Sequence, residues 1–160
     1  SGTIANSGTL IASGTGSLLE IDGSAVVSGG AVVVGNGIVD VLFGGTANVR
    51  FLSTGSGGLE IADTNANSSA FTGMVSGFGG VNHSNHKQFI DLVSVTSAPN
   101  TISLSYVSAA SHTSGTLFVS SGGVQVAAIT MVGHYSAGNF HITQLDFGQK
   151  FNGLAMVRKA

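Results

Sequence analysis

Short apolar runs alternate with polar turn residues along most of the chain. Val, Ile and Leu gather in these runs, and clusters of Gly, Ser and Asn separate them. This pattern is typical of β-strands divided by turns, because β-branched residues fit a pleated surface and small polar residues fit turns. No segment keeps apolar residues at spacings of three and four, so we expect essentially no long helix. The pattern predicts an all-β fold.

An apolar–acidic–apolar motif recurs every twenty residues in the N-terminal half. It occurs as Leu19-Glu20-Ile21, Val39-Asp40-Val41 and Leu59-Glu60-Ile61. In the same register we expect a second apolar column and two stacks of glycines, formed by Ile11, Ala31, Phe51 and Phe71, by Gly35 and Gly55, and by Gly37, Gly57 and Gly77. Twenty residues suit one coil of a parallel β-helix, with about three short strands joined by turns.

Strand alternation assigns the two faces of each predicted coil. The apolar members of the motif point inward, whereas Glu20, Asp40 and Glu60 point outward and stack at about the 4.8 Å strand spacing. The glycines are expected at corners that need a positive φ. The period predicts a parallel β-solenoid, and a β-sandwich is the main alternative. We expect right-handed coils, although the period itself does not determine the handedness.

The period fades after Phe78-Gly79-Gly80. The later apolar runs are separated by turns such as Ser-Ala-Pro-Asn, and they fit antiparallel hairpins better than coils. A hairpin-rich unit covers the apolar core and the unpaired strand edges that a solenoid end exposes. We therefore expect solenoid coils over residues 1–79, a C-terminal β-hairpin-rich capping unit or a continuation of the solenoid over 80–147, and a basic tail over 148–160.

Composition and charge narrow the function classes. Hydrophobic residues make up 42% and charged residues 8% of the chain, a balance that favours a folded core over disorder. The net charge is −2 and the basic residues are not clustered, so we expect no nucleic-acid binding. The longest apolar run, over 124–132, is far shorter than the roughly 20 residues of a spanning helix, so no membrane span is expected. The chain has no cysteine, which excludes disulfides and thiolate chemistry.

Several segments carry a family resemblance. Gly2–Leu10 and Ser17–Ile21 resemble β-helical repeats of autotransporter-type passenger regions. A second set of segments resembles a unit found in very large exported proteins of rhizobia and other proteobacteria. These segments are Ser76–Gly79, Phe89–Leu92, Ile102–Tyr106, Gly115–Leu117 and Val132–Phe140. The resemblance implies an extracellular or bacterial cell-surface location and a structural or adhesive role. It implies no catalytic residue and no cofactor.

The column Glu20, Asp40 and Glu60 is the sharpest candidate site. Its main interpretation is a solvated ladder that discourages lateral sheet association, because carboxylates one strand apart on a wet face repel by only about 0.9 kcal/mol. The alternatives are a weak divalent-cation site and a glycosidase pair about 5 Å apart. We expect nothing on this face to raise the pKa of an acid.

The histidines form a second candidate site. All five lie between positions 83 and 141. The run His83-Ser84-Asn85-His86 has a metal-chelating spacing, and the candidate third ligands are Asp91, His112, His134 and His141. The alternative is a plain polar loop, since exposed histidines are common in turn-rich stretches. The sequence assigns no metal and no other cofactor.

Taken with the resemblance, these patterns predict a non-enzymatic extracellular module, structural or adhesive, of a bacterial surface or secreted protein. Its expected contacts are self-association through solenoid ends or edges and a carbohydrate or host-surface ligand. The alternative is a carbohydrate-binding or carbohydrate-cleaving β-helix protein. A lyase of that kind needs a base beside the acids, whereas Arg50 is expected to neighbour Gly30 and Ala70.

Overall fold

The computed structural model describes residues 2–21, 26–41, 46–61, 71–93, 95, 101–143 and 155–159. Over these ranges the protein is all-β, as the sequence predicts, with short strands and no α-helix. Two single-turn 3₁₀ helices, η1 (Val81–His83) and η3 (Ala137–Asn139), interrupt the strands. Across the same ranges, no helix has the length and apolar character that crossing a membrane requires.

The described strands form three sheets. A two-stranded parallel sheet pairs β1 (Thr3–Ala5) with β4 (Val26–Ser28). The six-stranded sheet has the order β14 (Phe140–Thr143), β15 (Ala155–Lys159), β10 (Phe89–Leu92), β8 (Gly58–Ile61), β6 (Ile38–Val41), β3 (Leu18–Ile21). The seven-stranded sheet has the order β11 (Ile102–Ser108), β12 (Ser114–Ser121), β13 (Val124–Val132), β9 (Met74–Ser76), β7 (Val49–Phe51), β5 (Ala31–Val34), β2 (Thr9–Ala12).

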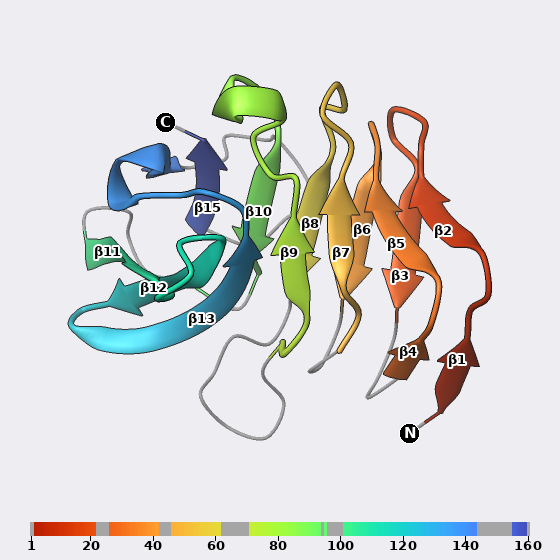
Figure 1. Ribbon diagram of the computed structural model, residues 1–160, viewed down its shortest axis with the longest axis horizontal. Coiled ribbons are helices and arrows are strands. Elements are labelled where there is room, and N and C mark those ends of the chain that lie inside the picture. Colours follow the sequence, from red (N-terminus) through yellow and green to blue (C-terminus); the bar gives the residue numbers. More distant parts are fainter. Residues whose placement is uncertain are drawn as a thin grey trace.

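The two larger sheets lie as neighbouring layers (Figure 1). From β5 to β10, consecutive strands belong alternately to the seven-stranded and the six-stranded sheet, so the chain crosses between the layers at each turn. Strands β3, β6, β8 and β10 pair in parallel in one layer. Strands β2, β5, β7, β9 and β13 pair in parallel in the other. The protein is therefore built mainly of parallel sheets.

The facing sides of the two layers share one apolar core. Val32 and Phe51 enter it from the seven-stranded sheet, and Val39, Leu59 and Ile90 enter it from the six-stranded sheet. Each of these side chains is at most 2% exposed. Burial of an aliphatic or aromatic side chain of this size contributes about 1.5–3 kcal/mol. The short strands are therefore stabilised by packing between the two layers, because strands this short are not stable by themselves.

The twenty-residue register is present in the six-stranded sheet. Leu19 pairs with Val39, and Val39 pairs with Leu59, each step being twenty residues. The next step pairs Leu59 with Ile90 and spans thirty-one residues, from position 59 to position 90. Ile90 begins a fourth apolar–acidic–apolar motif, which the equal spacing of the first three does not reveal.

The predicted second apolar column is wrong in its register. Ile11 pairs with Val33 rather than with Ala31, and Phe51 pairs with Val34. The corners that lead into the seven-stranded sheet differ in length, so the paired residues are not twenty apart. The regular period therefore belongs to one sheet and not to both.

The glycine stacks form in part, but not because corners need a positive φ. The Gly57 amide donates to the Gly35 carbonyl oxygen over 2.9 Å, and the Gly58 amide donates to that of Gly37 over 3.1 Å. A side-chain carbon on Gly57 would overlap the Gly37 carbonyl oxygen, so close backbone approach excludes larger residues. Gly77, at φ 70°, lies instead against the Phe51 carbonyl oxygen.

The C-terminal half combines antiparallel and parallel pairing. Strands β11, β12 and β13 form antiparallel hairpins, as the sequence predicts for this stretch. Strands β10 and β13, however, extend the parallel sheets of the N-terminal half. Residues 155–159, for which the sequence predicts only a basic tail, form β15, which pairs antiparallel with both β10 and β14. The residues from 144 to 154 lie outside the described ranges.

Candidate functional site

The acidic motif positions come together as one row across the six-stranded sheet. Glu20 pairs with Asp40, Asp40 with Glu60, and Glu60 with Asp91. Their apolar sequence neighbours, such as Leu59, face the core, so alternation directs the four carboxyl groups to the opposite side of the sheet. The structure confirms the predicted pairing of the first three acids. It adds Asp91, which the sequence associates with the histidines.

Burial increases steadily along this acidic row. Glu20 is exposed and Asp40 is half-buried, whereas Glu60 is 5% exposed and Asp91 is fully buried. The expectation of a solvated ladder is therefore wrong beyond the first two strands. Three oxygens in the row, Asp40 Oδ1 and both carboxyl oxygens of Asp91, are buried without a hydrogen-bond partner in the described part of the chain. A buried carboxylate is costly unless a proton, a hydrogen bond or a cation compensates its charge.

The same burial raises the pKa of three acids, contrary to the sequence expectation. Burial and then repulsion by Glu20 raise the pKa of Asp40 to about 6. Burial, Asp40 and Asp91 raise the pKa of Glu60 to about 7. Burial raises the pKa of Asp91 to about 6, against a smaller lowering by the Leu92 backbone and with a further rise from Asp40. Neither Asp91 oxygen makes a hydrogen bond of regular geometry, so burial dominates there.

The histidine site does not assemble around Asp91. His86 is exposed in the turn before β10, whereas Asp91 is fully buried within that strand. His83 lies in η1, and its side chain is outside the described part of the structure. Among the residues described, no three Asp, Glu or His side chains converge in a way that would hold a metal ion.

A polar hollow of about 450 Å³ lies beside His86. Its lining residues are Ser53, Thr54, Ser84, Asn85, His86 and Lys87. The Asn85 side-chain amide donates to the carbonyl oxygens of Ser53 and Gly55 over 2.9 and 2.6 Å. Asn85 therefore fastens this turn to the chain that follows β7, and its amide nitrogen is engaged in that structural role.

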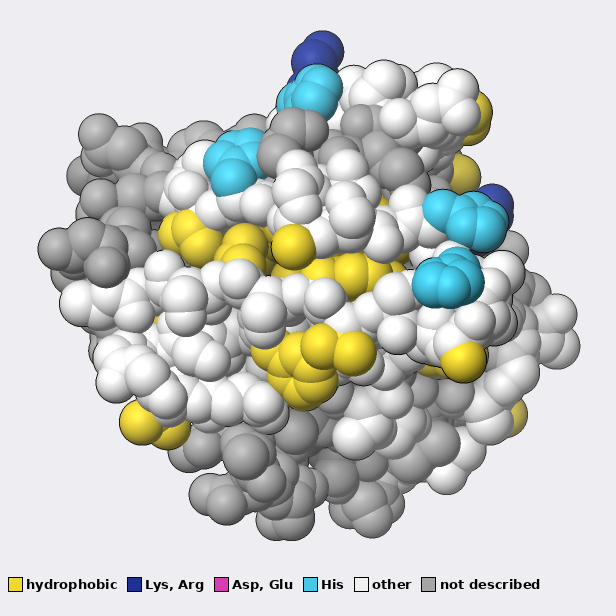
Figure 2. All heavy atoms as spheres, turned by 60° about the vertical axis from the view of Figure 1, so that its left-hand side comes forward, with side chains coloured by type: hydrophobic (Ala, Val, Ile, Leu, Met, Phe, Trp, Pro, Cys, Tyr) yellow, Lys and Arg dark blue, Asp and Glu magenta, His cyan; other side chains and the backbone are white. Residues whose placement is uncertain are grey.

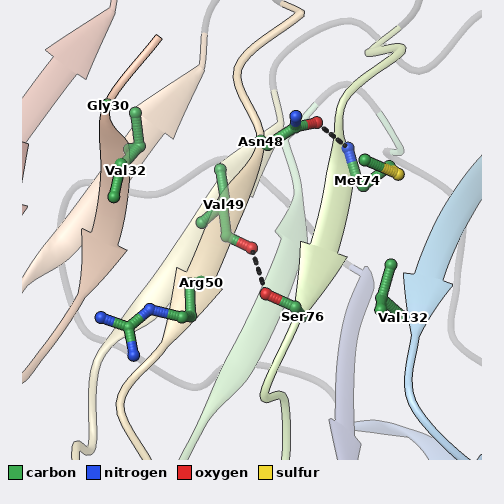
Figure 3. Close-up of a pocket in the computed structure, with 9 residues that line it drawn as sticks. Gly30, Val32, Asn48, Val49, Arg50, Met74, Ser76 and Val132 are labelled. Carbon is green, nitrogen blue, oxygen red and sulfur yellow. Dashed lines mark hydrogen bonds between the residues drawn. The ribbon is translucent and has the colours of Figure 1, made fainter. Parts of the chain in front are cut away.

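A second hollow, of about 270 Å³, lies on the outer side of the seven-stranded sheet (Figure 3). Its lining residues are Gly30, Ala31, Val32, Asn48, Val49, Arg50, Met74, Ser76 and Val132. The Asn48 side-chain oxygen accepts from the Met74 amide over 2.9 Å, and the Ser76 hydroxyl donates to the Val49 carbonyl oxygen over 3.4 Å. Figure 3 shows the Arg50 side chain extending away from Met74, toward β5.

Arg50 has other neighbours than the sequence predicts. Its paired residues are Val33 and Ser76, not Gly30 and Ala70. No acidic residue lines its hollow, and the acidic row belongs to the other sheet. Within the described residues, the arrangement that a lyase needs, a base beside acids, is therefore not formed around Arg50.

The end of the molecule that carries β11 to β13 presents apolar side chains and histidines (Figure 2). Val107 and Val124 are 59% and 67% exposed. No acidic side chain of the described residues is visible in this view. This end of the molecule therefore presents histidine side chains, whereas the acidic row consists of carboxyl groups.

No family model, curated protein or solved structure matches the chain.

Proposed function

We propose that the chain is a parallel β-solenoid segment in which the β11–β12–β13 hairpins cap one end. The observation that carries this proposal is the register of Leu19, Val39, Leu59 and Ile90, four paired residues on consecutive strands of one sheet. Alternation of consecutive strands between the two layers supports it further, because a solenoid coil visits each sheet once per turn. At the hairpin end, the Tyr106 and Phe140 rings lie 5.6 Å apart and join β11 to β14.

Paired cysteines test this architecture, since the chain has none of its own. Leu18 and Ile38 are paired on adjacent strands, and neither side chain is buried. Neighbouring strands lie about 4.8 Å apart, within the Cα separation that a disulfide accepts. The L18C/I38C variant should oxidise to an intramolecular disulfide, whereas I11C/I38C, with its cysteines on different sheets, should not. Equal cross-linking of the two variants contradicts the proposed coils.

The function that this architecture supports best is that of a non-enzymatic structural or adhesive passenger module of a bacterial surface or secreted protein. Continuous backbone ladders and a shared core give a rigid body that can present a regular outer surface. Glu60 and Asp91, two of the three acids whose pKa is raised by burial, are too buried to reach a sugar ring, which argues against a glycosidase pair. The corresponding location is extracellular or at the cell surface.

Retention of coated beads under flow tests the adhesive role. Beads carrying the intact chain should remain on glycan-coated or host-cell surfaces at shear that removes albumin-coated beads. A heat-unfolded sample of the same protein is the control for non-specific stickiness. Retention no better than that of albumin, on every surface, contradicts an adhesive role and leaves a purely structural module.

Binding of an acidic carbohydrate is a second candidate function, favoured by the hollow beside Arg50. Among the described residues that line this hollow, Arg50 is the one cation and none is acidic. A guanidinium group recognises carboxylates and sulfates well. Affinity for an acidic glycan should fall on Arg50→Gln and stay unchanged on Lys87→Gln, which removes a cation from the other hollow. Equal loss in both variants would indicate only non-specific charge attraction.

A further inference from the structure

We propose that Asp40, Glu60 and Asp91 form a proton-binding site of the folded chain, so that the row stabilises the protein in acidic surroundings and the protein becomes less stable as these acids lose protons. This inference is independent of the adhesive role. It concerns the six-stranded sheet, and it implies that Glu60 and Asp91, at the buried end of the acidic row, share a proton. The site is a pH-sensitive device built into the paired strands.

The strand pairing holds the acids together. The ladders of β6, β8 and β10 fix the paired positions at about 4.8 Å, so the backbone positions that carry neighbouring carboxyl groups cannot separate without breaking backbone pairing. In water such neighbours repel weakly, but the repulsion grows as burial removes the solvent. Glu60 and Asp91 are the two most buried members. Full ionisation of this pair is therefore unfavourable, and a shared proton relieves it.

No compensating cation lies at the paired positions of the three acids. On the N-terminal side the row ends at the exposed Glu20. On the other side, the residue paired with Asp91 is Met156 of β15, and the residue paired with Met156 is Thr143 of β14. Of the basic residues on these strands, Lys159 is paired with Phe140, and Arg158 is paired with both Phe89 and His141. Arg158 is two positions from Met156, so it belongs to the same face of the sheet as Asp91, at a diagonal rather than a paired position.

The unpartnered oxygens point to the same conclusion. Both Asp91 oxygens and one Asp40 oxygen lack a hydrogen-bond partner in the described residues. A protonated carboxyl group becomes a donor and can use a neighbouring carboxyl oxygen as its acceptor. The proton thus supplies both the missing hydrogen bond and the missing neutralisation. Among the described residues no three ligating side chains converge on a metal position.

The direction of the pH effect follows from the raised pKa values. In the folded chain the pKa is about 6 for Asp40 and Asp91 and about 7 for Glu60, against ordinary values of 3.8 and 4.5. Between about pH 4 and pH 7 the folded chain therefore binds more protons than the unfolded chain. Stability from this row is fully present below the unfolded pKa values and is lost as the pH rises through the folded ones.

Equilibrium urea unfolding at pH 5 and pH 8 tests the proposal on the whole chain. Each unit of pKa shift changes the folding equilibrium constant tenfold, so the unfolding constant should rise at least tenfold from pH 5 to pH 8. The variants Glu60→Gln and Asp91→Asn, which imitate the protonated groups, should reduce this pH dependence. Glu20→Gln, at the exposed end of the row, is the matched control and should reduce the pH dependence less than either variant, because Glu20 contributes only the smaller cause of the raised pKa of Asp40. A profile that is flat in the wild type, or unaltered in both variants, overturns the proposal.

Carboxyl carbon NMR of the wild-type chain gives a readout that needs no substitution. The Glu60 and Asp91 carboxyl signals should titrate with midpoints above pH 5.5, and midpoints near 4 would overturn the proposal. Calcium at millimolar concentration should not change unfolding at pH 8. Stabilisation by calcium in the wild type that is lost in Glu60→Gln would also overturn it, because the row would then be a cation site.

Discussion

The Tyr135 hydroxyl donates a hydrogen bond of 2.8 Å to the carbonyl oxygen of Phe78, a residue fifty-seven positions earlier in the chain. Both side chains belong to the core, at 8% and 0% exposure. The Phe140 ring stacks on Phe78 at 6.3 Å and contacts Tyr135 at 5.4 Å. This contact joins the turn after β13 to the turn after β9, and burial raises the pKa of Tyr135 to about 12. The hydroxyl is therefore a structural donor at any ordinary pH.

Replacing Tyr135 by Phe should lower the free energy of unfolding by about 1 kcal/mol, the usual net value of one hydrogen bond. The matched control is Tyr106→Phe, because the Tyr106 hydroxyl is buried without a hydrogen-bond partner in the described residues. That control should be neutral or slightly stabilising. Urea unfolding at constant pH measures both. Equal losses in the two variants would show that the hydrogen bond from Tyr135 to Phe78 makes no specific contribution to stability.

Gln88 is a buried amide that satisfies backbone groups from distant segments. Its Nε2 donates to the carbonyl oxygens of Leu52 and Gly55, at 2.5 and 3.3 Å, and its Oε1 accepts from the Gly79 amide at 2.7 Å. Gln88→Leu should cost about 3 kcal/mol, because each buried backbone group left without a partner costs about 1–3 kcal/mol. The exposed Gln125 provides the control, and Gln125→Leu should change thermal unfolding little. A Gln88→Leu protein as stable as the wild type contradicts this role.

Gly57 tests the close approach of the backbone that leads into β8 to the backbone that leads into β6. Gly57→Ala places a methyl group against the Gly37 carbonyl oxygen and should cost about 2 kcal/mol or more through displacement of β8. Gly14→Ala is the control, because no atom lies near the added methyl group. It should be neutral or slightly stabilising, since alanine restricts the unfolded chain more than glycine does. Differential scanning calorimetry of both proteins separates steric overlap from a general effect of losing glycine.

Edge strands β2 and β3 should mediate self-association. They end the two larger sheets on the same side, and Ile11 and Leu18 on them are 44% and 59% exposed. Unpaired apolar edges join other edges readily, and a lysine discourages this pairing. Leu18→Lys should shift the protein toward monomer in sedimentation velocity, whereas Val81→Lys, at a site 68% exposed on η1, should not. Concentration-independent monomers in the wild type contradict the prediction.

The acidic row shows how far the sequence pattern extends. Two equal steps of twenty residues predict the pairing of Glu20, Asp40 and Glu60, because in-register strands repeat the same face pattern. The burial of Glu60 and Asp91 is not predictable in the same way. A side chain on the outer face is exposed or covered according to what packs over it, and a local pattern does not contain that information. The pKa values depend on this burial and are missed with it.

The pairing in the seven-stranded sheet and the pairing of β15 are not predictable from the sequence repeat. Arg50 pairs with Val33, seventeen positions earlier, and with Ser76, twenty-six positions later, so no single period describes its neighbours. Residues 155–159 are a short basic segment with no repeat partner in the sequence. They become a strand because β10 and β14 present edges on both sides. Pairing with distant edges overrides local propensity there.

Leu59 and Ile90 are direct neighbours in one sheet although thirty-one residues separate them, while Leu19 and Val39 are equally close at a separation of twenty. The alignment of the strands is therefore insensitive to how much chain the corner contains. In evolutionary terms, insertions and deletions in the connections between β8 and β10 can accumulate without disturbing the sheets. For engineering, these connections are the place to graft a foreign peptide or a second domain while the strands on either side keep their alignment.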